Sequence, residues 1–277
     1  MSKSLSEKFV SRYGETPNFE PSGETSTISA QFDHRCHRDF TDEAVAENLL
    51  QTLFAAAFCA PSKSDLQQVS VIRLSAPETR DALAKDNPAI RRLLKAPEFL
   101  VWCGDNRRIR RLAAAQGKPF ANDHLDAFMN AAVDTAIVMQ NFILAAESAG
   151  LGCCPVSQVR DNINQLSQLL GLPEHVFPVA GLALGWPALE GRISMRLPNR
   201  VTVHENSYLD ENLMHEVQKY DTRRANAEPT PDSAQLHTGD FGLNEEYGWS
   251  EHRCRQYAKP MRANFGAYIR AQGFDLS

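Results

Sequence analysis

The spacing of apolar positions along the chain predicts several helices. A helix is expected from Thr41, which can cap it, to about Pro61, with an apolar face formed by Val45, Leu49, Leu50, Leu53 and Phe54. A longer apolar helix is expected over 122–148, and it should end at Gly150, a residue suited to the left-handed turn after a helix. Its apolar residues surround much of its circumference, so it should be buried. A last helical stretch begins at Trp249.

Short β-branched and aromatic runs between these helices are typical of core strands. Two such runs, 69–74 and 99–103, are expected to share one sheet. Two further strands are expected over 151–156 and 176–184, separated by a helix over 158–170. Helices and strands therefore alternate, which indicates a mixed α and β class.

The ends of the chain are more polar than its middle. Residues 1–30 are rich in Ser, Thr, Glu, Pro and Gly and keep neither a helical nor a strand period, so they are expected to form an N-terminal arm. Residues 31–225 form the expected core. Residues 226–277 are expected to be a polar insertion or flap, centred on 226–248, followed by a C-terminal helical extension of the same domain.

Charge and cysteine content narrow the classes of function. The chain has 277 residues, a net charge of -5 and 43% hydrophobic residues, so it is globular and lacks a general nucleic-acid or membrane surface. No window approaches the length of an apolar membrane span, and we expect a cytoplasmic protein. The six cysteines form no Cys-x-x-Cys or Cys/His cluster, so we expect reduced thiols and no metal.

Three polar segments are candidates for chemistry. The cationic segment His34-Arg35-Cys36-His37-Arg38-Asp39-Phe40 suits a phosphate, although a solvated charge run is an alternative. The loop 60–67 has hydrogen-bonding side chains that suit a ligand, although an ordinary turn is the alternative. Over residues 150–160 a strand leads into the start of a helix. The N-terminus of that helix suits an anion, although an ordinary capped surface helix is the alternative. No Gly-x-Gly-x-x-Gly, Walker A, Gly-x-Ser-x-Gly or His-Glu-x-x-His motif occurs.

In this order and spacing, the three segments resemble the nitroreductase superfamily, in its NADPH-dependent nitroreductase and flavin reductase branch. The segments that carry the resemblance are His34 to Phe40, Pro61-Ser62-Lys63-Ser64, Gly150-Leu151-Gly152 with Ser157 to Arg160, Leu182 to Pro187, and Arg196-Leu197-Pro198. The resemblance covers about residues 32–224, with a weaker match over the terminal helix.

The resemblance implies a fold and an activity. The fold is α+β, the nitroreductase fold, with a mixed, mostly antiparallel sheet flanked by helices, a long buried central helix and an intertwined homodimer. The activity is that of an FMN-dependent NAD(P)H oxidoreductase. NADPH, or NADH, delivers hydride to flavin N5 in a ping-pong cycle, and a small acceptor such as a nitroaromatic, quinone or flavin then takes it.

The resemblance also assigns roles to residues. His34, Arg35 and Arg160 would engage the FMN phosphate, and Arg38, the catalytic residue, would lie near the pyrimidine edge and stabilise the anionic reduced flavin. The other cofactor-binding residues that it implies are Cys36, then Ser62, Lys63 and Ser64 in a loop from the partner subunit, Ser157 and Gln158 with a backbone N–H facing N5, and Arg196 at the NADPH 2'-phosphate.

The chain departs from the pattern of this branch at three positions. Cys36 stands where Ser is usual, and Lys63 and Asp65 lie in a loop normally made of Ser, Thr or Asn. Two alternatives therefore stay open. One is a specialised enzyme of the superfamily, of reductive dehalogenase or flavin-destructase type, with 226–248 as a lid. The other is a non-catalytic flavin-binding protein.

Overall fold

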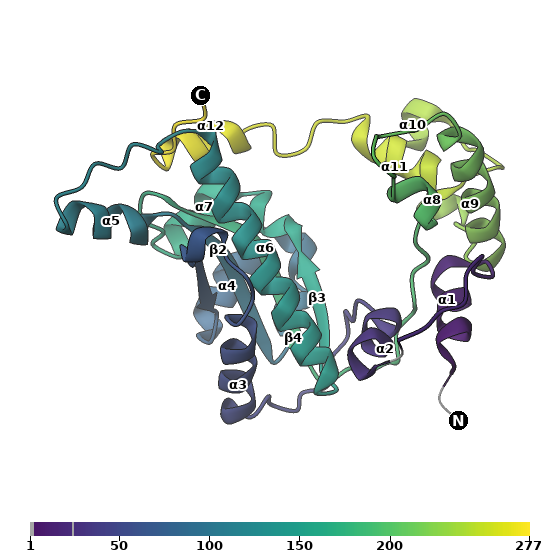
Figure 1. Ribbon diagram of the computed structural model, residues 1–277, viewed down its shortest axis with the longest axis horizontal. Coiled ribbons are helices and arrows are strands. Elements are labelled where there is room, and N and C mark those ends of the chain that lie inside the picture. Colours follow the sequence, from purple (N-terminus) through teal and green to yellow (C-terminus); the bar gives the residue numbers. More distant parts are fainter. Residues whose placement is uncertain (1–2, 24) are drawn as a thin grey trace. The chain divides into compact units, whose positions relative to one another are not determined.

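The computed structural model describes residues 3–23 and 25–277 and divides the chain into two compact units (Figure 1). We call His34–Arg192 with Arg262–Ser277 the sheet unit, and the residues up to Asp33 with Ile193–Met261 the helical unit. This division differs from the sequence-based borders at 30/31 and 225/226, because the N-terminal residues make their contacts with the segment that follows residue 192.

The sheet unit is built on one four-stranded sheet with the order β1-β2-β4-β3 and antiparallel pairing throughout. The strands are β1 (Val69–Arg73), β2 (Glu98–Asp105), β3 (Gly152–Val156) and β4 (Val176–Gly185). All four expected strands are present, and the first two share one sheet, as predicted; the structure places them next to each other. The α+β class and the mostly antiparallel sheet expected from the sequence are confirmed.

Helices cover both faces of this sheet. Figure 1 shows α3 and α6 in front of the sheet and α4 behind it. The helices of the sheet unit are α3 (Glu47–Ala57), α4 (Pro77–Asp86), α5 (Arg107–Ala115), α6 (Leu125–Ser148), α7 (Ile163–Leu169) and α12 (Phe265–Ala271), with single 3-10 turns η1 (Lys63–Asp65), η2 (Pro88–Ile90), η3 (Leu93–Lys95) and η4 (Ser157–Arg160).

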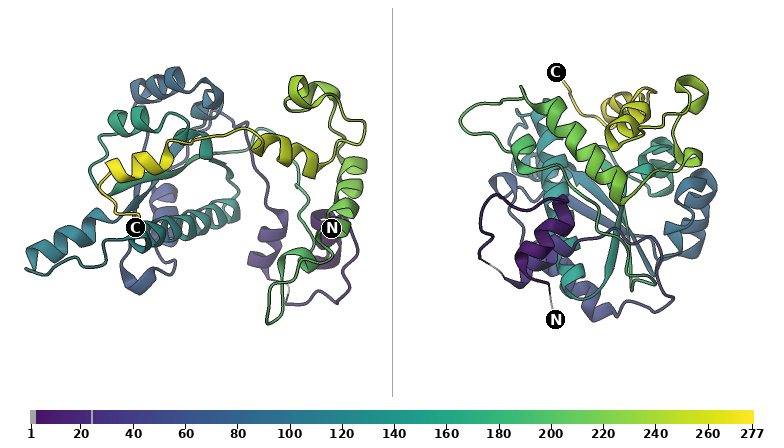
Figure 2. Two further views of the ribbon diagram at one scale, coloured as in Figure 1. Left: turned by 90° about the horizontal axis from the view of Figure 1, so that it is seen from above. Right: turned by 90° about the vertical axis from the view of Figure 1, so that its right-hand side faces the viewer.

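Strand β2 lies at the centre of the core because all of its residues are buried. Leu100 and Trp102 pack with α3 and α6, whereas Phe99 and Val101 pack on the opposite face. Burying side chains of this size contributes about 1.5 to 3 kcal/mol each. A third cluster joins α12 to the first turns of α6, and the two helices lie side by side in Figure 2.

The predicted start of the helix over 41–61 is wrong, because α3 begins only at Glu47 and ends at Ala57. The N–H of Thr41 donates to the carbonyl of Trp186 at 2.9 Å, and Phe40 forms a bridge with Pro187. Tertiary pairing therefore keeps this segment extended. The helix expected over 158–170 is also shorter, since the turn η4 precedes α7.

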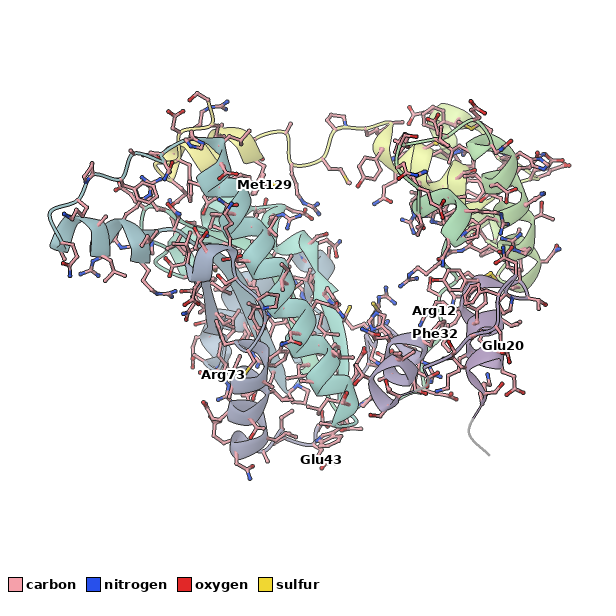
Figure 3. The ribbon with its side chains drawn as sticks, viewed as in Figure 1. Arg12, Glu20, Phe32, Glu43, Arg73 and Met129 are labelled. Atoms are coloured by element: carbon pink, nitrogen blue, oxygen red, sulfur yellow. The ribbon has the colours of Figure 1, made fainter. Side chains whose placement is uncertain are left out.

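Helix α6 is confirmed, but it is buried on one side only. Val138, Phe142 and Ile143 lie in the core, whereas the other side exposes a stripe formed by Leu125, Met129, Val133 and Ile137 (Met129 is labelled in Figure 3). Among the described residues, α6 alone is long and apolar enough to cross a membrane, contrary to the sequence expectation that no window approaches this length. Its packing on the sheet accounts for that apolar content.

The helical unit contains structure where the sequence predicted an irregular arm. Its helices are α1 (Leu5–Tyr13), α2 (Ser26–Asp33), α8 (Asn199–Thr202), α9 (Leu213–Ala227), α10 (Thr238–Phe241) and α11 (Trp249–Tyr257), with the 3-10 turn η5 (Asp232–Ala234). The reciprocal bonds of Ser4 and Glu7 cap α1, a Ser-x-x-Glu signal that the sequence displays. Arg12 donates to the carbonyl of Phe32, which joins α1 to α2 (Figure 3).

The segment 226–248 is folded against its own unit. It contains two short helical turns, η5 and α10. Arg255 of α11 is 4% exposed and donates to the carbonyls of Leu236 at 3.1 Å and Gly242 at 2.7 Å. These bonds fix the segment to α11.

Candidate functional site

The cationic segment that begins at His34 lies along the start of β3. The N–H of His37 donates to the carbonyl of Cys153 at 3.0 Å, and Cys36 forms a parallel bridge with the same residue. Close approach requires glycine at 152, because a Cβ there would lie 2.8 Å from the His37 ring. The strand therefore positions the whole segment.

An ionic chain runs from α6 into this segment. Nδ1 of His34 lies 2.6 Å from Oε1 of Glu147 in the last turn of α6. Hydrogen bonds with Cys36 and with Glu147 raise the pKa of His34 to about 9. Hydrogen bonds from Cys154 and from His34 lower the pKa of Cys36 to about 4, so this residue is a thiolate at neutral pH.

The arginines of the segment have donors to spare. Nη1 of Arg35 donates to Oε1 of Glu190 at 2.9 Å, but its buried Nε has no partner in the described chain. Nε2 of His37 lies 3.0 Å from the carbonyl of Glu190, and its buried Nδ1 is likewise unpartnered within the described residues. Arg38 is exposed, with no hydrogen bond or ion pair to the described part of the chain. Unpaired cationic donors of this kind fit a phosphate-bearing ligand.

The loop that contains Ser62 and Ser64 is anchored to α6 by a buried carboxylate. Asp134 is 1% exposed and accepts from Oγ of Ser62 at 2.8 Å and from the N–H of Lys63 at 3.0 Å. Three residues of the loop have positive φ angles without being glycine: Ser64 (49°), Asp65 (56°) and Gln67 (50°). Ser62 therefore shapes the loop, while Lys63 and Ser64 are exposed.

The third predicted segment lies at the far end of β3. Ser157 and Gln158 are exposed in η4, and Oγ of Ser157 accepts from Arg262 at 3.4 Å. Arg160 instead donates to the carbonyl of Val179 and lies 5.7 Å from the centroid of the Phe265 ring. Burial and then the nearby charge of Arg262 lower the pKa of Arg160. Its guanidinium thus stabilises β4 in this structure.

Within one chain, the cationic segment and the Ser62–Ser64 loop lie far apart. His34 is fixed to Glu147 and Ser62 to Asp134, and these two carboxylates are 13 residues apart on α6. At a rise of 1.5 Å per residue, this corresponds to roughly 20 Å. A single ligand site in one chain therefore does not bring the cationic segment and the Ser62–Ser64 loop together.

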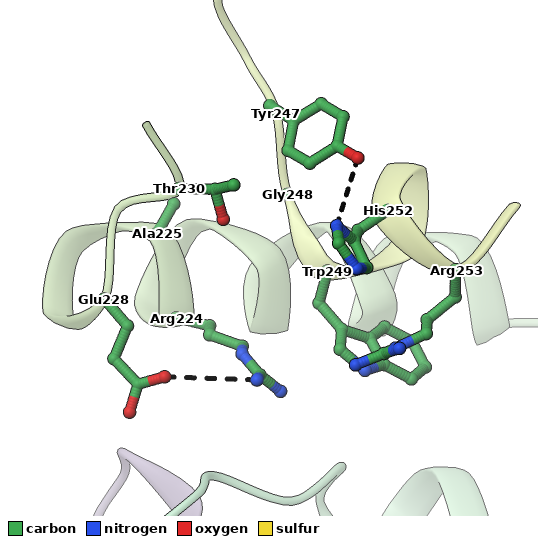
Figure 4. A pocket seen from close by; sticks show the side chains of 9 residues that line it. All are labelled: Arg224, Ala225, Glu228, Thr230, Tyr247, Gly248, Trp249, His252 and Arg253. Carbon is green, nitrogen blue, oxygen red and sulfur yellow. Dashed lines mark hydrogen bonds and ion pairs between the residues drawn. The ribbon is translucent and has the colours of Figure 1, made fainter. Parts of the chain in front are cut away.

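Arg196 belongs to the helical unit. It is exposed, and its Nη1 donates to the carbonyl of Ser194 at 3.0 Å. The same unit has a pocket of about 450 Å³, including its open mouth, shown in Figure 4. Residues of α9, α11 and the intervening segment line it: Arg224, Ala225, Glu228, Thr230, Tyr247, Gly248, Trp249, His252 and Arg253.

Three residues that sequence analysis missed complete these arrangements. Asp134 is a carboxylate in the middle of a largely apolar helix, and Glu147 is a carboxylate near its C-terminus, where negative charge is unfavourable. Both were visible as anomalies in the sequence. Cys154 was expected only as a reduced thiol, and its interaction with Cys36 depends on tertiary structure. The described residues contain no group of three or more His, Cys, Asp or Glu that would hold a metal.

Comparisons with known proteins cover most of the chain. The sequence model described as "Nitroreductase family" matches residues 32–186, and "Nitroreductase family, C-terminal domain" matches residues 194–277. The oxygen-insensitive NADPH nitroreductase of Salmonella typhimurium is 36% identical over 251 residues, which cover 90% of this chain and 98% of that protein. The NADPH-flavin oxidoreductase of Vibrio harveyi is 33% identical over 249 residues, with the same coverage.

Solved structures of proteins with similar sequences also have a similar fold. NfrA2 of B. megaterium has a TM-score of 0.82 at 29% identity, covering 92% of this chain and 100% of that one. The NADPH:FMN oxidoreductase of Vibrio harveyi, complexed with NAD+, has a TM-score of 0.77 at 32% identity, covering 90% and 98%.

Proposed function

This chain belongs to the nitroreductase family and is an FMN-dependent NAD(P)H oxidoreductase, and from that premise we propose that it passes hydride from NADPH, by way of FMN, to a small acceptor. When bound, FMN supplies the redox chemistry, taking up hydride at N5 and releasing it to the acceptor in a ping-pong cycle. The acceptor class that we propose is a nitroaromatic, a quinone or a flavin. The observation that carries the site is the set of unpaired cationic donors beside β3.

We assign the FMN phosphate to His34 and Arg35. Arg35 has a buried Nε without an acceptor in the described chain, and His34 is held as a cation by Cys36 and Glu147. Arg38 is exposed next to them and is free to place its charge against the pyrimidine edge of the flavin, where it would favour the reduced anion. Cys36 lies within the same segment, where its thiolate opposes the phosphate charge.

The structure supports the remaining proposed cofactor contacts to different degrees. Ser157 and Gln158 are exposed at a turn and have the freedom to face flavin N5 with a backbone N–H. Arg160 would have to release the carbonyl of Val179 before it reached a phosphate, so we rank it below Arg35. Arg196 is exposed and is proposed for the 2'-phosphate of NADPH.

We propose that the working enzyme is a homodimer. The exposed stripe of α6 consists of residues spaced by four, which therefore lie on one helix face, and their exposures range from 37% for Ile137 to 55% for Met129. A partner covering this stripe would bring its own loop with Ser62, Lys63 and Ser64 to the cationic segment, which one chain keeps roughly 20 Å away. Each flavin would then be held by two subunits.

We further propose that the enzyme works in the cytoplasm. All six cysteines are free thiols, which is typical of a reducing compartment. The acidic net charge of -5 gives no general affinity for nucleic acid.

An anaerobic cycle tests the proposed activity. NADPH should bleach the absorbance of the flavin in the purified protein, and a nitroaromatic or a quinone added afterwards should restore the yellow colour. Restoration by neither acceptor, after full bleaching, would reject the proposed acceptor class. A protein that binds FMN but is not bleached would be a flavin-binding protein without turnover.

Mixed dimers test the shared site. Arg35→Ala should damage the cationic segment, and Ser64→Glu should damage the loop that faces the partner. Neither homodimer should retain FMN, but a heterodimer of the two variants contains one site with both segments intact. It should bind about one FMN per dimer. Absence of flavin from the purified heterodimer would contradict the shared site.

A further inference from the structure

The pocket of the helical unit is lined by positively charged side chains. It lies between the C-terminal end of α9 and the first turn of α11, and it has a volume of about 450 Å³ with its open mouth. Figure 4 shows Arg224 of α9 and Arg253 of α11 pointing into the same space. None of the residues that we assign to FMN or NADPH lines this pocket, so the proposed activity does not explain its charges.

The two guanidinium groups carry more positive charge than the pocket neutralises. Nη1 of Arg224 donates to Oη of Tyr220 at 2.9 Å, and its Nη2 lies 3.9 Å from Oε2 of Glu228, a long ion pair. Nη1 of Arg253 donates to Oε1 of Gln256 at 2.7 Å, which is a neutral acceptor, and no carboxylate in the described part of the chain forms an ion pair with this arginine. Two cationic groups therefore share one carboxylate at this pocket.

A chain of hydrogen bonds orients His252 so that it adds a further donor. The N–H of Leu236 donates to Oη of Tyr247 at 3.0 Å, and this oxygen lies 3.1 Å from Nδ1 of His252. Because the Tyr247 hydroxyl has no other acceptor among the described residues, it donates to Nδ1, and the ring proton is on Nε2. Burial, and then the positive charges of Arg253 and Arg224, lower the pKa of His252, so the ring is neutral at pH 7. Its Nε2–H has no acceptor within the described chain.

We propose that this pocket binds a small aromatic monocarboxylate, at a ligand site that is distinct from the flavin contacts. The carboxylate accepts from Arg224, from Arg253 and from Nε2 of His252, since guanidinium groups match the two oxygens of a carboxylate. One negative charge balances the single excess positive charge of the lining, whereas a phosphate dianion exceeds it. The side chains of Tyr247 and Trp249 supply the aromatic wall for a planar ring.

Calorimetric titration of the full chain with its flavin tests this site, with benzoate as the probe. Benzoate should bind, whereas benzamide, which has nearly the same shape but no charge, should bind at least about tenfold more weakly. The visible spectrum of the flavin should not change, which separates this site from binding on the flavin itself. NMR titration of the histidine rings should show that benzoate raises the pKa of His252, because a bound negative charge favours the protonated ring beside the two arginines.

Substitutions of the two arginines locate the site. Arg224→Gln should weaken benzoate binding roughly tenfold and Arg253→Gln roughly fivefold, because Arg253 is the more exposed of the two. The matched control is Arg111→Gln, since Arg111 is an exposed arginine of α5 in the sheet unit, and it should leave the Kd unchanged. If Arg224→Gln does not fold, the shift in the pKa of His252 in the wild type decides. No measurable binding of benzoate, tighter binding of inorganic phosphate, equal Kd values in the three variants, or a pKa of His252 that benzoate leaves unchanged would overturn the proposal.

Discussion

Replacing Asp134 by Ala removes the carboxylate that holds the Ser62–Ser64 loop to α6. Oγ of Ser62, the N–H of Lys63 and, more weakly at 3.4 Å, the N–H of Gln68 all donate to it. The side chain is 1% exposed, so water does not readily replace the lost acceptor. The substitution therefore leaves donors unpaired inside the sheet unit.

The size of the effect follows from these bonds. Two well-formed hydrogen bonds to a charged acceptor contribute about 1.5 to 3 kcal/mol each, so we expect a loss of about 3 to 6 kcal/mol in the free energy of unfolding. The three left-handed residues of the loop cost roughly 1 kcal/mol each in the wild type, so relaxation of the loop in the variant would return part of this loss. For a unit of this size the loss corresponds to a decrease in Tm of roughly 10 °C.

Thermal unfolding of the full chain measures this loss, and Asp126→Asn is the matched control. Asp126 lies on the same helix but is exposed, and within the described part of the chain its side chain accepts a hydrogen bond only from Asn130, at 2.8 Å. The control should cost at most about 1 kcal/mol. Asp134→Asn keeps one acceptor and should fall between the two. Equal Tm values for Asp134→Ala and Asp126→Asn would refute the anchoring role of Asp134.

Three further substitutions test other parts of the account. Arg38→Ala should slow anaerobic reduction of the flavin by NADPH at least tenfold while changing the Kd for FMN less than about threefold; equal reduction rates in stopped-flow measurements would refute its role. Val133→Glu on the exposed stripe should convert the dimer to monomers in light scattering, whereas the same change at Val203, an exposed valine of the helical unit, should not. The raised pKa of His34 stabilises the fold below about pH 6.5, and this stabilisation is lost as the pH rises through about 9. The lowered pKa of Cys36 stabilises the fold at high pH, and this second stabilisation is lost as the pH falls through about 4. These slopes oppose each other near neutrality, so stability should fall between about pH 6.5 and 4, and Cys36→Ser should flatten that fall in Tm measurements.

The strands and the central helix were predictable because burial controls their sequences. In β2 every residue is buried, so the run of apolar residues reports the strand directly. The start of α3 was not predictable, since the partner of Thr41 is Trp186, far along the chain. The short helix α1 was missed for another reason: its capping residues were legible, but its apolar pattern spans only nine residues.

The candidate site was predictable only as a set of residue types. The cluster of His34, Arg35 and Arg38 stood out in an acidic chain, and its resemblance to a family gave it a ligand. The pairing of His34 with Glu147, and of Ser62 with Asp134, depends on how the segments meet α6. Arg160 shows the same limit, because its sequence position suited an anion whereas its guanidinium bonds a carbonyl of β4.

Anaerobic titration of the purified protein with NADPH, followed by its visible spectrum, tests the central claim most directly. The account predicts a bound flavin that loses its absorbance near 450 nm (about the usual flavin maximum) as about one NADPH per flavin is added. A colourless protein that takes up no FMN, or a bound flavin whose spectrum NADPH and NADH leave unchanged, would contradict it.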